Sequence, residues 1–180
     1  MTVAWSAVFG DTHPVEVEIG PGRGEALLGL AAAAPGTNFF AIERTNGSVA
    51  AIERKVAARG LPNVRLVAGD ARCVVAHLVP ADSVAAYHVY FPDPWPKRRH
   101  HRRRLAATDF ATALARTLVP GGAVHVASDL PSVVEELAVH LGDAALVRDR
   151  TAIPPLRPTT SFERRYALEG TCYACWRRPT

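Results

Sequence analysis

The sequence predicts an α/β protein with a parallel sheet and helices on both faces. Short runs rich in β-branched residues alternate with helical stretches along the chain, and clusters of proline or glycine end the helices where strands should begin. These clusters are Pro35-Gly36, Gly60-Leu61-Pro62 and Pro120-Gly121-Gly122. The expected strands are Val15 to Ile19, Asn38 to Glu43, Val64 to Val67, Ser83 to Phe91, Ala123 to Ser128, Ala144 to Arg148 and Tyr166 to Trp176. The expected helices are Glu25 to Ala34, Ser48 to Arg59, Arg103 to Leu118 and Pro131 to Leu141.

Length and composition favour a single domain spanning residues 1–180. With 180 residues, 48% of them hydrophobic, the chain suffices for one core but is short for two ordinary domains. No window holds the roughly 20 uninterrupted apolar residues of a membrane span, and Met1 to His13 lacks the basic and apolar regions of a leader. We therefore expect a cytoplasmic protein, either a monomer or a homodimer. The structure of residues 1–13 stays open: Trp5 and Phe9 either pack on the domain or belong to a binding surface.

Cysteine and histidine positions give little indication of a metal site or a disulfide framework. Cys172 and Cys175 lie three apart in an expected strand, where such positions point to opposite faces, and no second cysteine pair completes a zinc site. Adjacent His100 and His101 lack a carboxylate or thiolate partner nearby in sequence. We expect reduced, packed thiols and no bound metal.

The net charge of +4 comes from one short segment. Lys97 to Arg104 reads KRRHHRRR and holds six of the 21 Lys and Arg residues, which leaves 15 basic residues against 17 acidic ones elsewhere, a balance of −2. Such a run is typical of a patch that binds a polyanion. A solvated helix start is the alternative interpretation.

A glycine-rich turn and two carboxylates predict a nucleotide site at the carboxyl edge of the sheet. Glu18-Ile19-Gly20-Pro21-Gly22-Arg23-Gly24 ends the first strand and opens the first helix, where backbone N–H groups meet the polar end of a ligand. Glu43 closes the second strand, where it can accept from ribose hydroxyls, and Asp70 in Gly69-Asp70-Ala71 closes the third, within reach of an adenine amino group. A tight strand-to-helix turn with no ligand remains the alternative for the glycines alone.

The glycine spacing and Glu18 favour S-adenosylmethionine over a dinucleotide as the cofactor. Dinucleotide enzymes share the glycines and a carboxylate like Glu43, so those features do not separate the two. Here Gly20, Gly22 and Gly24 follow the pattern G-x-G-x-G, whereas a pyrophosphate fits G-x-G-x-x-G. The Glu18 carboxylate would repel phosphates and attract a cationic methionine moiety.

A proline-stiffened segment after the fourth strand points to a planar substrate. Phe91 to His101 reads FPDPWPKRRHH, in which three prolines fix the backbone around Asp93 and Trp95 beside the predicted cofactor site. An aromatic ring can stack on a heterocycle, and a carboxylate can accept from guanine N1–H and N2–H or stabilise positive charge on the base. A proline-rich turn with a core tryptophan is the alternative.

The chain closely resembles the bacterial tRNA (guanine-N7)-methyltransferase family. The matching stretches spread from residue 18 to residue 165, and the Pro-Asp-Pro-Trp-Pro-Lys stretch followed by Thr-x-Phe-Glu is the most specific part. They are Glu18 to Gly24, Ala41 to Glu43, Asn63-Val64, Gly69 to Ala71, Phe91 to Arg104, Ser128-Asp129 and Thr160 to Arg165.

The resemblance implies a Rossmann-like methyltransferase fold: a mostly parallel seven-stranded sheet with an antiparallel last strand. It implies S-adenosylmethionine as cofactor, methyl transfer to N7 of a guanosine in tRNA, and Asp93 as the catalytic residue. The cofactor-binding residues would be Glu18, Gly20, Gly22, Gly24, Glu43, Asp70, Ala71 and Asp93. The substrate-binding residues would be Lys97, Arg98, His100, Arg103, Asp129, Thr160, Phe162 and Glu163.

Two other functions remain open at this point. Members of the family usually carry a longer amino-terminal segment before the glycine turn, which here begins at Gly20. A relative of this kind could methylate a free purine, a nucleoside or a related heterocycle. An RNA-binding module with an inactive cofactor fold is the third possibility, and the presence of every expected acidic residue argues against it.

Overall fold

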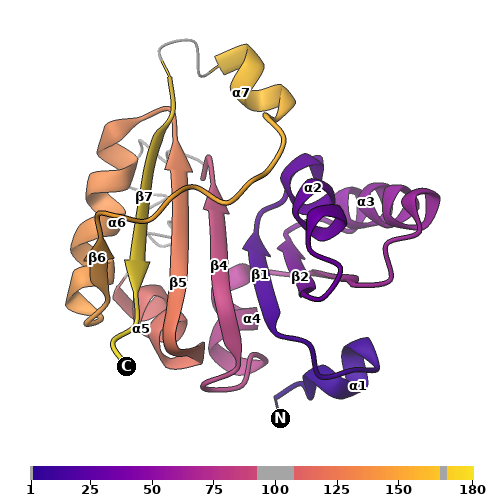
Figure 1. Cartoon of the computed structure of the whole chain (residues 1–180), viewed down its shortest axis with the longest axis horizontal. Helices are drawn as coiled ribbons and strands as arrows, with labels where there is room; N and C mark the ends of the chain where they lie inside the picture. The colour runs from indigo at the N-terminus through magenta and orange to yellow at the C-terminus, as the bar shows by residue number, and fades with distance from the viewer. Residues whose placement is uncertain (1, 93–107, 167–169) are drawn as a thin grey trace.

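The computed structural model describes residues 2–92, 108–166 and 170–180, and its centre is a seven-stranded sheet (Figure 1). The strand order is β3-β2-β1-β4-β5-β7-β6. The first five strands pair in parallel, and β7 runs antiparallel to both β5 and β6. This confirms the expected mostly parallel sheet with an antiparallel last strand. The strands are β1 (Val15–Ile19), β2 (Asn38–Glu43), β3 (Val64–Ala68), β4 (Val84–Tyr90), β5 (Leu118–Ser128), β6 (Val147–Asp149) and β7 (Cys172–Arg177).

Helices cover both faces of the sheet, as predicted. On one face α4, α5 and α6 bury the larger core, in which Val17, Ile19 and Val89 of the sheet meet Phe110 and Leu137. On the other face α2 and α3 pack over β2 and β3. The helices in the described residues are α1 (Trp5–Phe9), α2 (Glu25–Ala33), α3 (Asn46–Arg59), α4 (Ala71–His77), α5 (Thr108–Thr117), α6 (Pro131–Asp143) and α7 (Ser161–Tyr166). None of these is long and apolar enough to span a membrane.

Several predicted boundaries were wrong. The helix α4 was not predicted, and residues 161–166 form α7, so the last strand begins at Cys172 and not at Tyr166. The sixth strand is shorter than expected, because α6 continues to Asp143 and Ala145 adopts a positive φ of 61° before the chain extends. The fifth strand begins earlier, at Leu118, and includes the expected helix stop at residues 120–122. Of the helix predicted from Arg103, residues 103–107 lie outside the described part.

The amino-terminal segment packs on the domain, which settles the open question about residues 1–13 for the described part. The short helix α1 places Trp5 against Phe40, with ring centroids 5.1 Å apart, and buries Phe9. The Trp5 indole Nε1–H donates to Ser83 Oγ over 3.0 Å. These contacts tie the start of the described chain to the sheet at the end opposite the carboxyl edge.

Part of the second sheet face is covered by an irregular segment rather than a helix. Residues 150–160, here called the strap, join β6 to α7 and cross in front of β7, β5 and β4 in Figure 1. Ala152 of the strap packs on a small cluster formed by Ala86, Ala123 and Cys175. At its far end Pro158 lies so close to Gly29 of α2 that a Cβ on that glycine would be 2.1 Å from the proline Cδ. The strap therefore brings α7 to the carboxyl edge of the sheet.

Candidate functional site

The glycine turn after β1 forms the floor of a groove at the carboxyl edge of the sheet. Gly20, Gly22 and Gly24 have φ angles of 66°, 57° and 75°, a region that side chains with a Cβ disfavour. Gly24 caps α2, and a Cβ there would also meet the Ile52 side chain at 2.9 Å. The sequence needs glycine at these positions because the chain reverses sharply between strand and helix and leaves its backbone open to a ligand.

Glu18 is a buried carboxylate in this groove. Its residue is 2% exposed, and its Oε2 has no hydrogen-bond partner among the described residues. Burial raises the pKa of Glu18 to about 8, and the positive charge of Arg157 offsets only part of this effect. A buried carboxyl oxygen without a partner is costly, and a cationic ligand group would satisfy it.

Glu43 and Asp70 stand at the ends of the two neighbouring strands, as predicted. The Glu43 carboxylate accepts from the backbone N–H groups of Gly22 and Arg44 over 3.3 and 2.7 Å. Asp70 caps α4 by accepting from the backbone N–H of Arg72 over 2.9 Å. Partial burial raises the pKa of Asp70, but the bonds from Arg72 outweigh it, so the net shift is downward. Both side chains are therefore oriented by backbone N–H groups at the groove.

The groove consists of two adjoining cavities. The glutamate cavity, of about 490 Å³, is lined by Glu18, the glycine turn, the start of α2 and residues 160–162 of the α7 region. The aspartate cavity, of about 400 Å³, is lined by Glu43, Asp70, Ala71 and the same glycines. Tyr90, Phe91 and Phe162 line both cavities. Each volume lies within the range of about 300 to 1,000 Å³ that is usual for small-molecule sites.

Two aromatic rings border the groove. Phe91 follows β4 with a φ of 49°, unusual for a residue with a bulky side chain, and its ring centroid lies 5.1 Å from that of Phe162. Phe162 is 41% exposed. Strained backbone of this kind is concentrated at functional sites, where the surrounding structure holds it in place.

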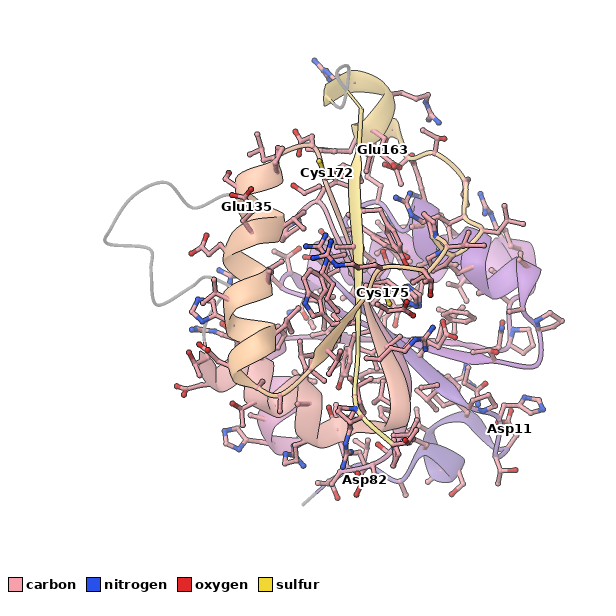
Figure 2. All side chains as sticks on the ribbon, turned by 60° about the vertical axis from the view of Figure 1, so that its left-hand side comes forward. Asp11, Asp82, Glu135, Glu163, Cys172 and Cys175 are labelled. Atoms are coloured by element: carbon pink, nitrogen blue, oxygen red, sulfur yellow. The ribbon has the colours of Figure 1, made fainter. Side chains whose placement is uncertain are left out.

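Thr160 and Glu163, which were predicted to contact the substrate, form the amino-terminal cap of α7. The Thr160 Oγ1 accepts from the backbone N–H of Glu163 over 3.2 Å, and the Glu163 carboxylate accepts from the N–H of Thr160 over 2.7 Å. This reciprocal pair is a capping box. Arg157 donates two further hydrogen bonds to the Glu163 carboxylate, over 2.7 and 2.9 Å. Figure 2 shows Glu163 at the carboxyl edge of the sheet, above the start of β7.

A second anchor fastens α7 to the glycine turn. The Glu25 carboxylate, at the start of α2, accepts from the backbone N–H of Ser161. This hydrogen bond is the main cause of a lowered pKa of Glu25. The glutamate cavity is thus enclosed by residues from both ends of the sequence.

A third, smaller cavity lies beside the groove, under the strap. This strap cavity, of about 250 Å³, is lined by Tyr90, Ala127, Pro154, Pro155, Arg157, Thr159, Glu163, Thr171 and Tyr173. Like the groove, it opens at the carboxyl edge of the sheet, over the ends of β4 and β5.

The structure brings together most of the predicted cofactor residues. Glu18, Gly20, Gly22, Glu43, Asp70 and Ala71 line the two cavities of the groove, and Gly24 shapes the turn beneath it. Thr160 and Phe162 line the groove, and Glu163 lines the strap cavity. Asp129 follows β5 and is not among the residues that line these three cavities. Asp93, Lys97, Arg98, His100 and Arg103 lie outside the described residues.

Among the residues of the site that were not predicted from the sequence, three build contacts between distant elements. Tyr90 is the last residue of β4, Glu25 is the first of α2, and Arg157 lies in the strap. The sequence did hold one signal for Arg157. It lies in a proline-rich loop six positions before Glu163, close enough for the two opposite charges to pair.

The cysteines of the chain are free, and the described residues hold no group of three or more His, Cys, Asp or Glu side chains that could bind a metal. Cys175 is buried and Cys172 is partly buried, and the two follow each other along β7 in Figure 2. The expectation of packed thiols in a strand is confirmed.

Comparison with known proteins identifies relatives over nearly the whole chain. Residues 12–175 match the family described as "Putative methyltransferase". The tRNA (guanine-N(7)-)-methyltransferase of Bordetella pertussis is 40% identical over 164 residues, which are 89% of this chain and 65% of that protein. That of Nitrosomonas eutropha is 37% identical over 163 residues, 88% of this chain and 73% of that protein. This chain therefore spans about 65% of the length of the Bordetella relative and more of the other.

Solved structures with low sequence identity share the fold. The 16S rRNA methyltransferase KamB superposes with a TM-score of 0.70 at 19% identity, covering 98% of this chain and 93% of that one. The aminoglycoside resistance methyltransferase NpmB1 gives a TM-score of 0.64 at 19% identity, covering 93% and 89%. The fold is thus the Rossmann-like fold of S-adenosylmethionine-dependent methyltransferases, and the sequence matches place this chain in the bacterial tRNA (guanine-N7)-methyltransferase family.

Proposed function

We propose that this protein transfers a methyl group from S-adenosylmethionine to N7 of a guanosine in tRNA. The observation that carries the proposal is the buried Glu18 carboxylate: in the part of the chain that the structure describes, its Oε2 has no partner, and it lines a cavity floored by glycine backbone. The aspartate cavity with Glu43 and Asp70 adjoins it. The names of the relatives support the same reaction.

The residues present fit S-adenosylmethionine. The cationic methionine end would lie against Glu18, because a positive group relieves the cost of the unpaired buried oxygen. Backbone groups of Gly20 and Gly22 would approach its polar atoms closely. Glu43 would accept from the ribose hydroxyls, and Asp70 with Ala71 would border the adenine. A dinucleotide pyrophosphate would fit poorly, since Glu18 would repel it.

The chemistry requires alignment more than proton transfer. When bound, S-adenosylmethionine supplies a methyl group on a positively charged sulfur, open to in-line displacement by a nitrogen lone pair. Guanine N7 carries an exposed lone pair and needs no base to activate it. Positioning two reactants near attack distance can offset roughly 7 to 11 kcal/mol of barrier. The protein's main task is therefore to hold the base against the groove and exclude water.

We assign Asp93 as the residue that acts on the base. Its carboxylate would accept from guanine N1–H and N2–H, or stabilise the positive charge that develops on the purine. We expect Asp93→Asn to lose methyl transfer while thermal unfolding and the heat of cofactor binding stay close to wild type. Turnover near the wild-type rate in this variant would contradict the assignment.

The basic run would bind the tRNA backbone in the cytoplasm. Lys97, Arg98, His100 and Arg103 belong to this run, and Asp129 and Phe162 would border the substrate nucleotide. Binding through phosphates weakens with salt, by roughly 0.7 to 0.9 log units of affinity per neutralised phosphate for each log unit of salt. Replacing Arg98 and Arg103 with Gln should remove up to about two phosphate contacts, so the slope of log affinity against log salt should become shallower by the corresponding amount. An unchanged slope would exclude the run from RNA binding.

One assay tests the reaction itself. The protein is incubated with isotope-labelled S-adenosylmethionine and bulk tRNA, and a nuclease digest is analysed by mass spectrometry for labelled 7-methylguanosine. Parallel reactions contain guanosine or guanosine monophosphate in place of tRNA. Labelled 7-methylguanosine in the tRNA digest supports the proposal. Label only in guanosine or guanosine monophosphate would show that the substrate is a small purine and not tRNA. Absence of both transfer and heat of cofactor binding would reject the reaction.

A further inference from the structure

Tyr90 stands where the three cavities at the carboxyl edge meet. Its side chain lines the glutamate cavity, the aspartate cavity and the strap cavity. The residue is only 8% exposed, and burial followed by the charge of Glu18 raises the pKa of its hydroxyl. Tyr90 thus borders both the proposed cofactor groove and the strap cavity.

From the interior of the sheet, two polar residues hold the Tyr90 hydroxyl in place. The His88 Nδ1 lies 2.8 Å from the Tyr90 hydroxyl, and the His88 Nε2 lies 2.7 Å from the Glu16 Oε2. His88 is 1% exposed, so both ring nitrogens depend on these partners. A carboxylate accepts only, so the His88 Nε2–H donates to Glu16. Glu16, His88 and Tyr90 therefore form a continuous hydrogen-bonded chain.

From the strap side, Arg157 covers the tyrosine ring. Its guanidinium carbon lies 4.3 Å from the ring centroid, a cation–π contact. The same guanidinium is paired with Glu163 through two hydrogen bonds, and both of these side chains are 11% exposed. Tyr90 is therefore held from β1 and β4 on one side and from the strap and α7 on the other.

We propose that Tyr90 is a further positioning residue of methyl transfer: its side chain borders both cavities of the proposed cofactor groove, and its anchors on two sides fix the surface against which the reactants align. The Glu16–His88 pair acts through Tyr90 by fixing its orientation. The inference rests on the proposed function and adds to it a residue that keeps the reacting groups in line.

Tyr90 would matter for rate because it borders the groove in which the reactants would align. A displacement of about 1 Å between reacting groups can reduce turnover by about a hundredfold even when binding is unaffected. Loss of the Tyr90 anchor should therefore lower kcat more than it weakens binding of the cofactor.

The chain offers a matched control for the test. Tyr87 lies on the same strand but on the opposite face, is fully buried, and forms one hydroxyl contact, 2.6 Å to Thr117 Oγ1. Tyr90→Phe and Tyr87→Phe thus remove the same group from similarly buried positions, one beside the cavities and one remote from them. For each variant we would measure thermal unfolding, the Kd for S-adenosylhomocysteine by calorimetry, and kcat and KM for tRNA.

We expect kcat to fall at least about tenfold in Tyr90→Phe with the Kd changed less than about threefold, and to stay within about twofold of wild type in Tyr87→Phe. Equal turnover in the two variants would overturn the inference. A wild-type protein without methyl transfer would instead reject the proposed function, so the two failures are distinguishable.

A double-mutant cycle tests the part played by His88. His88→Phe keeps an aromatic ring stacked near His125, whose centroid lies 5.3 Å away, and removes both polar contacts. If His88 acts through Tyr90, the double variant should turn over no more slowly than Tyr90→Phe alone. Independent, multiplying losses in kcat would show that His88 does not work through the tyrosine.

Discussion

Replacing Glu18 with glutamine should stabilise the ligand-free protein and weaken cofactor binding. Burial raises the pKa of this carboxyl from 4.5 to about 8. A carboxyl with a raised folded-state pKa stabilises the fold fully below pH 4.5, and this stability is lost as the pH rises towards 8. Each pH unit in that window costs up to about 1.4 kcal/mol, or roughly 3 kcal/mol by pH 7. Glutamine does not titrate, so Glu18→Gln should escape this loss.

Thermal unfolding between pH 4.5 and 8 measures the effect directly. For a chain of this size, roughly 3 kcal/mol corresponds to a Tm difference of about 6 to 12 °C at pH 7, with the variant more stable and the difference shrinking towards pH 4.5. The exposed Glu53 of α3 provides the control, since Glu53→Gln should follow the wild-type curve at every pH. Parallel curves for Glu18→Gln and wild type would show that the Glu18 carboxylate is not desolvated.

Calorimetry of cofactor binding tests the second half of the prediction. A cationic ligand favours the ionised carboxylate, so in the wild-type protein Kd should fall by up to about tenfold per pH unit until pH 8 and then level off. In Glu18→Gln this dependence should disappear and binding should be weaker throughout. Equal affinity in both proteins from pH 6 to 8 would refute the assignment of Glu18 to the cationic end of the ligand.

Three further changes test the elements that close the site. Gly29→Ala should lower the free energy of unfolding by about 1 to 3 kcal/mol, because its Cβ would collide with Pro158 of the strap. Gly142→Ala is the control: it has open space around it and should be neutral or stabilising, so equal effects of the two substitutions in urea melts would contradict the prediction. Arg157→Ala leaves the Glu163 carboxylate buried without its partner and should cost about 3 to 5 kcal/mol; a loss under about 1 kcal/mol would show that solvent replaces the arginine. Thr160→Ala removes a capping-box acceptor and should cost about 1 kcal/mol, whereas Thr160→Ser should stay near wild type in the same melts; equal melting of both would contradict the capping role.

The sequence was most informative where local pattern and tertiary structure agree. The strands β1 and β2 match their predicted bounds because each is a largely buried run, rich in β-branched or aromatic residues, between clear stops. The residues that line the groove followed from one geometric rule, that parallel strands end at the same edge, which placed Glu18, Glu43 and Asp70 together. That rule needs only the strand ends and not their order.

The sequence was least informative where long-range contacts decide the structure. The short helix α4 has little periodicity, although Asp70 as its cap was a usable signal. Thr160-x-x-Glu163 carries the signature of a helix start. Because it was interpreted only as a substrate motif, α7 was not predicted. The partnership of Arg157 with Tyr90 joins residues 67 positions apart, and no local pattern records it.

The two walls of the groove come from distant parts of the chain. Glu25 and Ser161, which bond across it, are 136 positions apart. Closing the long loop between such residues costs entropy that is regained only when the contact forms. Affinity for the cofactor is therefore acquired only when almost the entire polypeptide has assembled, and a ligand present during refolding would report on completion of the native state rather than on its early intermediates.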